Sequence, residues 1–448
     1  MKIVLSSRQR WLINMFMIIV YRLSLELIFI KIIIPYFSYR NMVFQWIPGH
    51  AVISWILLCP TILILIRLYH SEYISDMVVV VLLIFNFIPS TIYYSYSQMN
   101  FFWLFVMFYF CLILANTLIP HFIFKMGYRL DHPFLSNCFL AICVAIPVYI
   151  WGKYAKFRIY TNIFKVYAIR AEARQYDLST LLRYGFTMVQ VLLPILSIYF
   201  IAKKKKINSI LAIFAELLVF CINGSKSAVF SVIIVLCTYI AYKCLGNISK
   251  WITVGITALN FIAYIELIFH HTYKVGNIFI NRLLFMPNLL NYFYYEFFNS
   301  HGFDWFQSGF LSHFGFEPKY GLSLPRVIGT NYYGNFYGNE VTNANNGLFS
   351  DAYANLGLLG IIIMPIFTII LLRFYDACAN KLDKSIQTSC VVMAAMKIMG
   401  DSLFTVFLSG GMCATFALLL ILPRNDFGKN SNSLKTHSSE YLLHNKNH

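Results

Sequence analysis

Apolar segments follow one another along almost the whole of this chain, and this succession is incompatible with a soluble fold. Hydrophobic residues make up 59% of the 448 residues, and charged residues only 12%. This is more apolar surface than one soluble core can hide from water. The runs are continuous and do not alternate with polar residues, which favours helices over a β-barrel. The sequence therefore predicts an all-α polytopic membrane protein.

The apolar runs predict about twelve membrane-spanning helices, since one span takes about 20 residues. The first run is interrupted by Arg22, Glu26 and Lys31, and the spacing of Arg22 and Glu26 lets them pair on one helix face. We expect residues 1–423 to form a single transmembrane domain and residues 424–448 a disordered cytoplasmic tail. The expected spans are 12–34, 50–68, 76–94, 100–120, 134–151, 185–202, 207–223, 227–243, 250–270, 347–373, 386–403 and 405–423.

Lysine and arginine in the short loops set the expected orientation, because basic loops stay in the cytoplasm. The run from Lys203 to Lys206 is the strongest marker, and alternation from it places both termini in the cytoplasm. Two longer segments, about 152–184 and 271–346, then fall on the outer side. The first is rich in basic residues against the usual bias, and an anionic substrate there would explain this.

The formal net charge of +17 does not by itself indicate nucleic acid. Basic cytoplasmic loops, together with a basic outer face that meets anionic lipid head groups, account for it. We therefore expect membrane lipid as a partner and no nucleic acid. No metal-ligand spacing is evident in the sequence, and neither a metal site nor a cofactor is expected.

Two arginines stand out in the first outer segment. Arg170 and Arg174 are four residues apart, so in a helix both guanidinium groups share one face. Two such groups match a diphosphate, because each can bind two oxygens. The alternative is that Arg170 pairs with Glu172, or that both arginines reach lipid phosphates. Lys226, after the Asn223–Gly224 turn, is a weaker candidate that also fits an interfacial lysine.

The second outer segment is rich in aromatic residues, glycines and amides. Aromatic rings stack on sugar faces and also form interfacial belts, while amides and carboxylates suit ligands with many hydroxyls. Arg282 stands where this segment leaves a span, and Asp351 stands where it re-enters one. We expect the two ends to meet, which would place a cation and a carboxylate in one cleft or, alternatively, in a structural salt bridge. Arg326, Glu340, Asn346 and Tyr353 are further candidates for contacting a substrate.

The order of these motifs resembles bacterial O-antigen or capsule repeat-unit polymerases of the Wzy type. The resemblance covers roughly residues 160–375. It takes in Tyr167–Arg174, then Gly224–Ser227, then Arg282 with Pro287, and finally the stretch from Asn346 to Gly360. Each motif alone is weak, and the match depends on their order and on their shared outer placement.

The resemblance implies a metal-independent glycosyltransferase of GT-C-like architecture in the bacterial inner membrane. Such an enzyme transfers a glycan chain from undecaprenyl diphosphate to the non-reducing end of another lipid-linked unit, on the periplasmic face. A flippase and a chain-length regulator of the same pathway are the implied partners. Catalytic roles would go to Arg170, Arg282 and Asp351. Substrate-binding roles would go to Arg174, Lys226, Arg326, Glu340, Asn346 and Tyr353.

Two other classes remain open on the sequence. The related O-antigen ligases carry a His-Asn pair near the position of Asn346, and its absence here argues against a ligase. A flippase or other transporter also has about twelve spans, but such proteins usually keep their loops short. The late segment of some 75 residues argues against that class.

Overall fold

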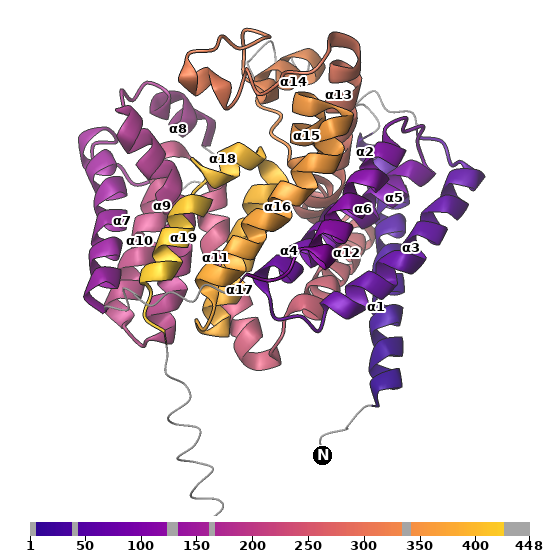
Figure 1. Cartoon of the computed structure of the whole chain (residues 1–448), viewed down its shortest axis with the longest axis horizontal. Helices are drawn as coiled ribbons and strands as arrows, with labels where there is room; N and C mark the ends of the chain where they lie inside the picture. The colour runs from indigo at the N-terminus through magenta and orange to yellow at the C-terminus, as the bar shows by residue number, and fades with distance from the viewer. Residues whose placement is uncertain (1–5, 38–43, 123–132, 161–165, 334–341, 425–448) are drawn as a thin grey trace, which may run out of the picture.

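The chain is built from helices. The computed structural model describes residues 6–37, 44–122, 133–160, 166–333 and 342–424, and no β-strand occurs among them. Figure 1 shows most of the helices running alongside one another as a bundle. The long apolar runs form these helices because a backbone in lipid must satisfy its own hydrogen bonds.

The first half of the chain supplies the helices on two sides of the bundle. These are α1 (Ser7–Ile28), π-helical η1 (Phe29–Ile33), α2 (Ile34–Phe37), α3 (Pro48–Leu68), α4 (Ile74–Leu82), π-helical η2 (Leu83–Phe87), α5 (Ile88–Ser95), α6 (Phe102–Leu118), α7 (Pro133–Lys153), α8 (Val166–Ala173), α9 (Thr180–Ala202) and α10 (Lys206–Asn223).

The second half contributes both spanning helices and a set of shorter ones. These are α11 (Lys226–Leu245), α12 (Ser249–His270), π-helical η3 (Gly276–Phe285), α13 (Met286–His301), 3-10 helix η4 (Leu311–Phe314), α14 (Leu324–Tyr333), α15 (Leu348–Leu356), α16 (Leu358–Ala379), α17 (Lys384–Gly400), α18 (Leu403–Phe407) and α19 (Met412–Ile421).

Nine helical stretches in the described residues are long and apolar enough to cross a membrane, where the sequence predicts about twelve. The chain is therefore a multi-pass membrane protein by length and composition. The three expected spans outside this set are helical nonetheless. Segment 12–34 falls on α1 and η1, while 100–120 and 386–403 fall on α6 and α17, which have 17 residues each.

The predicted pairing of Arg22 with Glu26 is confirmed. The two side chains lie 2.9 Å apart, and the Arg22 side chain is fully buried. Its guanidinium group also donates to the Ser54 hydroxyl and lies over the Trp55 ring. A charge inside a membrane helix is costly unless it is paired, and these contacts explain how α1 keeps an arginine inside the bundle.

The late segment 271–346 is more helical than its polar composition suggests. It begins with η3 and α13, which follow one another directly, and continues through η4 and α14. The aromatic residues of α13 recur at helical spacing, and Phe293, Phe297 and Phe298 are buried on its inner face. These phenylalanine rings therefore form the packing face of a helix.

The bundle has two distinct ends. Helices α8, α13, α14, α15 and α18 gather at one end, which we call the α15 end (Figure 1). The described chain begins with α1 and finishes with α19 at the opposite end (Figure 1). Helix α16 runs between the two ends, and this arrangement positions both sites described below.

Candidate functional site

A cavity of about 750 Å³ lies at the α15 end, where six separate segments meet. This volume falls within the range that small-ligand sites usually occupy. Its walls combine carboxylates, amides and hydroxyls with aromatic rings. The polar wall residues are Tyr184, Tyr294, Ser308, Ser312, Ser323, Asn345, Asn346, Asp351, Asn355, Asp401, Ser402, Thr405 and Ser409.

Asp351 is the buried carboxylate of this cavity. It lies in α15, outside the nine candidate spans, and only 6% of its surface is exposed. One carboxylate oxygen accepts a hydrogen bond from the Asn355 amide (2.9 Å), and the other accepts from the Leu403 N–H (2.9 Å). Asn355 is four residues further along α15, so the helix itself sets this pair.

Burial raises the pKa of Asp351 to about 6. The bonds from Leu403 and Asn355 oppose this shift, while the nearby charge of Asp304 adds to it. Desolvation disfavours the charged form of a carboxylate, and a pKa near the working pH is what a general base needs. Asp351 can therefore accept a proton from a ligand bound in this cavity.

Asn346 also lines the cavity, and a buried amide network holds it. Its side-chain N–H groups donate to the Asn291 amide oxygen (2.7 Å), to the Ser350 hydroxyl (2.7 Å) and to the Pro287 carbonyl (3.1 Å). Ser350 in turn donates to the same oxygen of Asn291 (2.8 Å). The chain just before α15 is therefore bonded to α13 through the amides of Asn346 and Asn291, and these bonds do not include Arg282.

A second carboxylate, Asp401, reaches the same cavity from the connection after α17. It lies 3.7 Å from the Lys397 ammonium group and accepts a hydrogen bond from Asn345 at 3.4 Å. Aromatic rings also line this cavity, where the ring of Phe404 packs against Phe306 (5.2 Å) and Phe310 (4.8 Å). Hydrogen-bond acceptors together with ring faces are the usual surroundings of a bound sugar.

The backbone is packed tightly where it brings Asn346 and Asp351 to the cavity. At Gly347 an added Cβ atom would lie only 2.6 Å from the Ile398 carbonyl oxygen and 2.7 Å from that of Met399. Only glycine permits this approach of α15 to the last turn of α17. The close contact fixes the entry of α15 relative to α17, and hence the position of Asp351.

Arg170 and Arg174 do not line this cavity. Both side chains are exposed, Arg170 in α8 and Arg174 just after it, and neither forms an ion pair within the described part of the chain. Glu172 is bonded instead to Arg158 and to the hydroxyl of Tyr176. The alternative pairing of Arg170 with Glu172 is therefore not formed, and the exposed guanidinium groups stay available for an anion.

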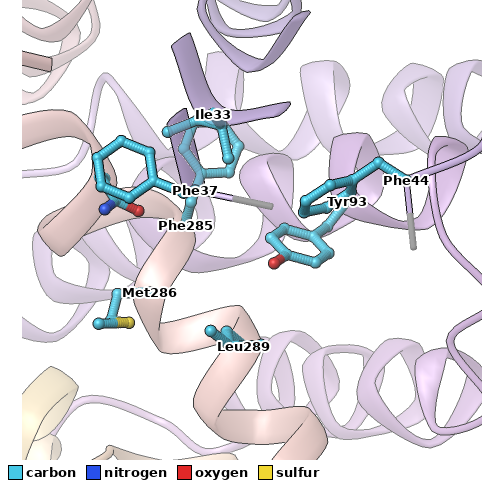
Figure 2. Close-up of a pocket in the computed structure, with 8 residues that line it drawn as sticks. Ile33, Phe37, Phe44, Tyr93, Phe285, Met286 and Leu289 are labelled. Carbon is cyan, nitrogen blue, oxygen red and sulfur yellow. The ribbon is translucent and has the colours of Figure 1, made fainter. Parts of the chain in front are cut away.

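Arg282 also does not contact Asp351. It is an exposed residue of η3 and makes no ion pair with Asp351, whose oxygens are bonded to Asn355 and Leu403. Its neighbour Phe285 closes a cavity of about 10 Å³, which Figure 2 shows surrounded by apolar and aromatic side chains. Such a volume holds about one water molecule.

The other predicted residues fall in different places. Lys226 is half-buried at the start of α11, after Gly224 in the left-handed conformation. Arg326 is exposed in the first turn of α14, next to the wall residues Leu324 and Pro325. Tyr353 is buried in α15 among other rings and is not part of the cavity wall. Glu340 lies outside the described residues.

Sequence analysis missed several residues of this site. Asp401 lies near the end of the expected span 386–403 and was therefore not considered as a site residue. The polar pair Asp401–Ser402 between two apolar runs does indicate a connection between two helices. Asn355 carried a clearer signal, because it lies one helical turn after Asp351. No sequence pattern predicts that Tyr184 and Met188 of α9 line the cavity, because they reach it only through the packing of helices that are distant in sequence.

Comparison with known protein families, with curated protein sequences and with solved structures finds no match for this chain.

Proposed function

We propose that this protein is a membrane glycosyltransferase that polymerises lipid-linked oligosaccharides, as O-antigen and capsule polymerases do. The observation that supports this best is the cavity at the α15 end. It brings a buried carboxylate with a pKa near 6 together with amides, hydroxyls and an aromatic wall. These are the groups that a reaction between a sugar hydroxyl and an activated glycan requires.

In the proposed reaction, an acceptor hydroxyl attacks the anomeric carbon of the donor glycan. The bond between that carbon and the diphosphate oxygen breaks, and its electron pair leaves with undecaprenyl diphosphate. The proton of the acceptor hydroxyl passes to Asp351. The side-chain oxygens of Asn346 and Asp401 accept hydrogen bonds from the hydroxyls of the acceptor sugar, while the rings of Phe404 and Phe310 stack against it.

Arginines outside the cavity are proposed to hold the two diphosphates. Arg326 borders the cavity wall, and α8, which contains Arg170 and ends just before Arg174, lies at the same end of the bundle (Figure 1). Guanidinium groups bind phosphate oxygens in pairs and offset the charge that develops on a leaving diphosphate. Arg282, an exposed residue of η3, stays a proposed catalytic residue that offsets the charge of the leaving diphosphate.

The proposal includes a bacterial inner membrane, cytoplasmic termini and a periplasmic α15 end. In this proposal three further helical stretches also cross the membrane: α1 with η1, α6 and α17. Together with the nine candidate spans they match the number of about twelve that the sequence predicts, in a GT-C-like arrangement. A flippase and a chain-length regulator would act beside it in the same pathway. The donor and the acceptor are both undecaprenyl-diphosphate-linked oligosaccharides.

Deletion of the gene in its host, followed by gel analysis of surface polysaccharide, tests this function. We expect single repeat units in place of a ladder, and restoration of the ladder by the wild-type gene. The isosteric variant Asp351→Asn should fail to restore it at normal protein level. The exposed Glu317→Gln variant is the matched control and should succeed. Loss of all surface units would indicate a flippase or ligase, and an unchanged ladder would refute the proposal.

A further inference from the structure

A second cavity, of about 480 Å³, lies between α3, α4, α6 and α16. Its walls carry Arg67, His70, Asp76, His121 and Arg373, along with apolar side chains. This concentration of charge is unusual in a chain with so few charged residues, and the proposed reaction does not use it.

This cavity lies toward the end of the bundle where α1 begins. Helix α16 starts beside α15, and Arg373 comes 15 positions after its first residue Leu358. At 1.5 Å per residue this is about 22 Å along the helix axis. Arg67 and His70 lie at the end of α3, close to the membrane edge on that side. The two cavities are therefore separate sites.

Buried hydrogen bonds fix the inner wall of the second cavity. Arg373, 1% exposed, donates to the carbonyl oxygens of Asn116 and Ile119 and to the Ser75 hydroxyl. Asp376, 2% exposed, accepts from the Ser75 N–H (3.0 Å) and hydroxyl (2.5 Å). These side chains form a buried hydrogen-bond network, in which Asp376 has little remaining capacity to accept hydrogen bonds.

The inner wall holds two carboxylates and one guanidinium group, and His121 lies against both carboxylates, with its Nδ1 3.0 Å from Asp376 and its Nε2 3.9 Å from Asp76. Two buried carboxylates, Asp76 and Asp376, lie 3.6 Å from a single guanidinium group, that of Arg373. Each oxygen of Asp76 accepts one hydrogen bond, from Asn116 or Ser71, and can accept another. The side-chain oxygen of Asn116, a residue only 9% exposed, has no partner among the described residues. Beside a neutral His121, a ligand with an ammonium group would supply a second positive charge and hydrogen-bond donors for Asp76.

The rim of the cavity has the opposite character. Arg67 and His70 are exposed there, and Arg67 forms no ion pair within the residues that the structure describes. Next to them lie the apolar side chains of Ile64, Leu68 and Val79. A cation at the rim suits a phosphate, and apolar walls at the membrane edge suit the first part of an acyl chain.

We propose that this cavity binds the head group of an amino-phospholipid. The primary ammonium group donates to Asp76, the phosphate meets Arg67 and His70, and the acyl chains leave along α3. The three N–H donors of a primary ammonium match the acceptors of the inner wall, which a quaternary ammonium cannot do. A lipid bound here would brace α16, the helix whose other end leads into α15.

Lipid binding to the purified full-length chain, freed of endogenous lipid in detergent, tests this inference. Dioctanoyl phosphatidylethanolamine should bind roughly ten- to hundredfold tighter than the choline and glycerol analogues, since a hydrogen bond to a charged group contributes about 1.5–3 kcal/mol. Equal affinity for the three lipids would overturn the proposal. It would fit a protonated His121 that provides the positive charge beside Asp76 and Asp376 in place of a ligand. Free phosphoethanolamine that saturates at the same concentration as the lipid would overturn the lipid assignment.

Two variants locate the site. Arg67→Gln should weaken all three lipids alike, because each carries the phosphate, whereas Lys250→Gln, an exposed cation at the same end but outside the cavity, should leave them unchanged. Asp76→Asn should remove only the preference for the ethanolamine lipid, and a preference that persists would overturn the proposal. Should Asp76→Asn fail to fold, Arg67→Gln decides alone, since unchanged binding in that variant places the lipid elsewhere.

Discussion

Asp351 is the residue on which the proposed chemistry depends, and its burial has opposite consequences for activity and for stability. A general base must be ionised, so polymerisation should fall as the pH drops through about 6. The folded state binds this proton more tightly than the unfolded chain does. Its contribution to stability is therefore full below about pH 4 and is lost as the pH rises through about 6.

The variant Asp351→Asn separates these two consequences. Polymer formation should drop by roughly a hundredfold or more, the usual contribution of a general base. Thermal unfolding in lipid nanodiscs at pH 8 should show a gain of about 1–3 kcal/mol, because a buried charge is removed. A variant that is both less active and less stable at pH 8 would instead make Asp351 a structural residue.

Asp304 offers a finer test at the same scale. Its carboxylate is fully buried, accepts bonds from the N–H and hydroxyl of Ser308, and is not part of the cavity wall. Its negative charge contributes to the raised pKa of Asp351. In Asp304→Asn the acidic limb of the pH–activity profile should therefore move to lower pH, with activity at pH 8 retained. A profile that does not move would show that the two carboxylates are not coupled.

At the scale of elements, α8 carries the clearest prediction. Arg170 is exposed, and the nearest acidic residue in sequence, Glu172, is bonded to Arg158. Arg170→Ala should reduce polymerisation about ten- to hundredfold at normal protein level, as loss of a charged hydrogen bond in the transition state implies. Lysine should restore it only in part, because it lacks the planar pair of donors. Lys156→Ala, another exposed cation of this segment, is the control, and equal losses in both would indicate a general surface charge effect.

The whole molecule makes a prediction about topology. Both ends of the described chain lie at the same end of the bundle (Figure 1), in keeping with an even number of spans. Cysteine labelling in intact cells should modify a cysteine that replaces Tyr320, at the α15 end, from outside. A cysteine that replaces Lys250, at the opposite end, should react only after lysis. Labelling of the first position only from the cytoplasm would invert the orientation.

The sequence predicted the helices better than it predicted the site. Continuous apolar runs located the spanning helices, and the four-residue spacing located the Arg22–Glu26 pair, because both depend on neighbours along the chain. The cavity depends on α9, α15 and α18 meeting, which no local pattern encodes. Arg282 and Asp351 were expected in one cleft because both border the same membrane edge. An edge does not fix which helices are neighbours, and the chain just before α15 is bonded to Asn291 of α13.

The most direct test of the central claim is a reaction with the purified full-length chain in lipid nanodiscs. Synthetic undecaprenyl-diphosphate-linked oligosaccharide is added without metal, and the products are followed by mass spectrometry. We predict a ladder of longer lipid-linked glycans, with one undecaprenyl diphosphate released for each new linkage, and none from Asp351→Asn. Release of undecaprenyl diphosphate without longer glycans, or an unchanged substrate with the wild-type chain, would contradict the account.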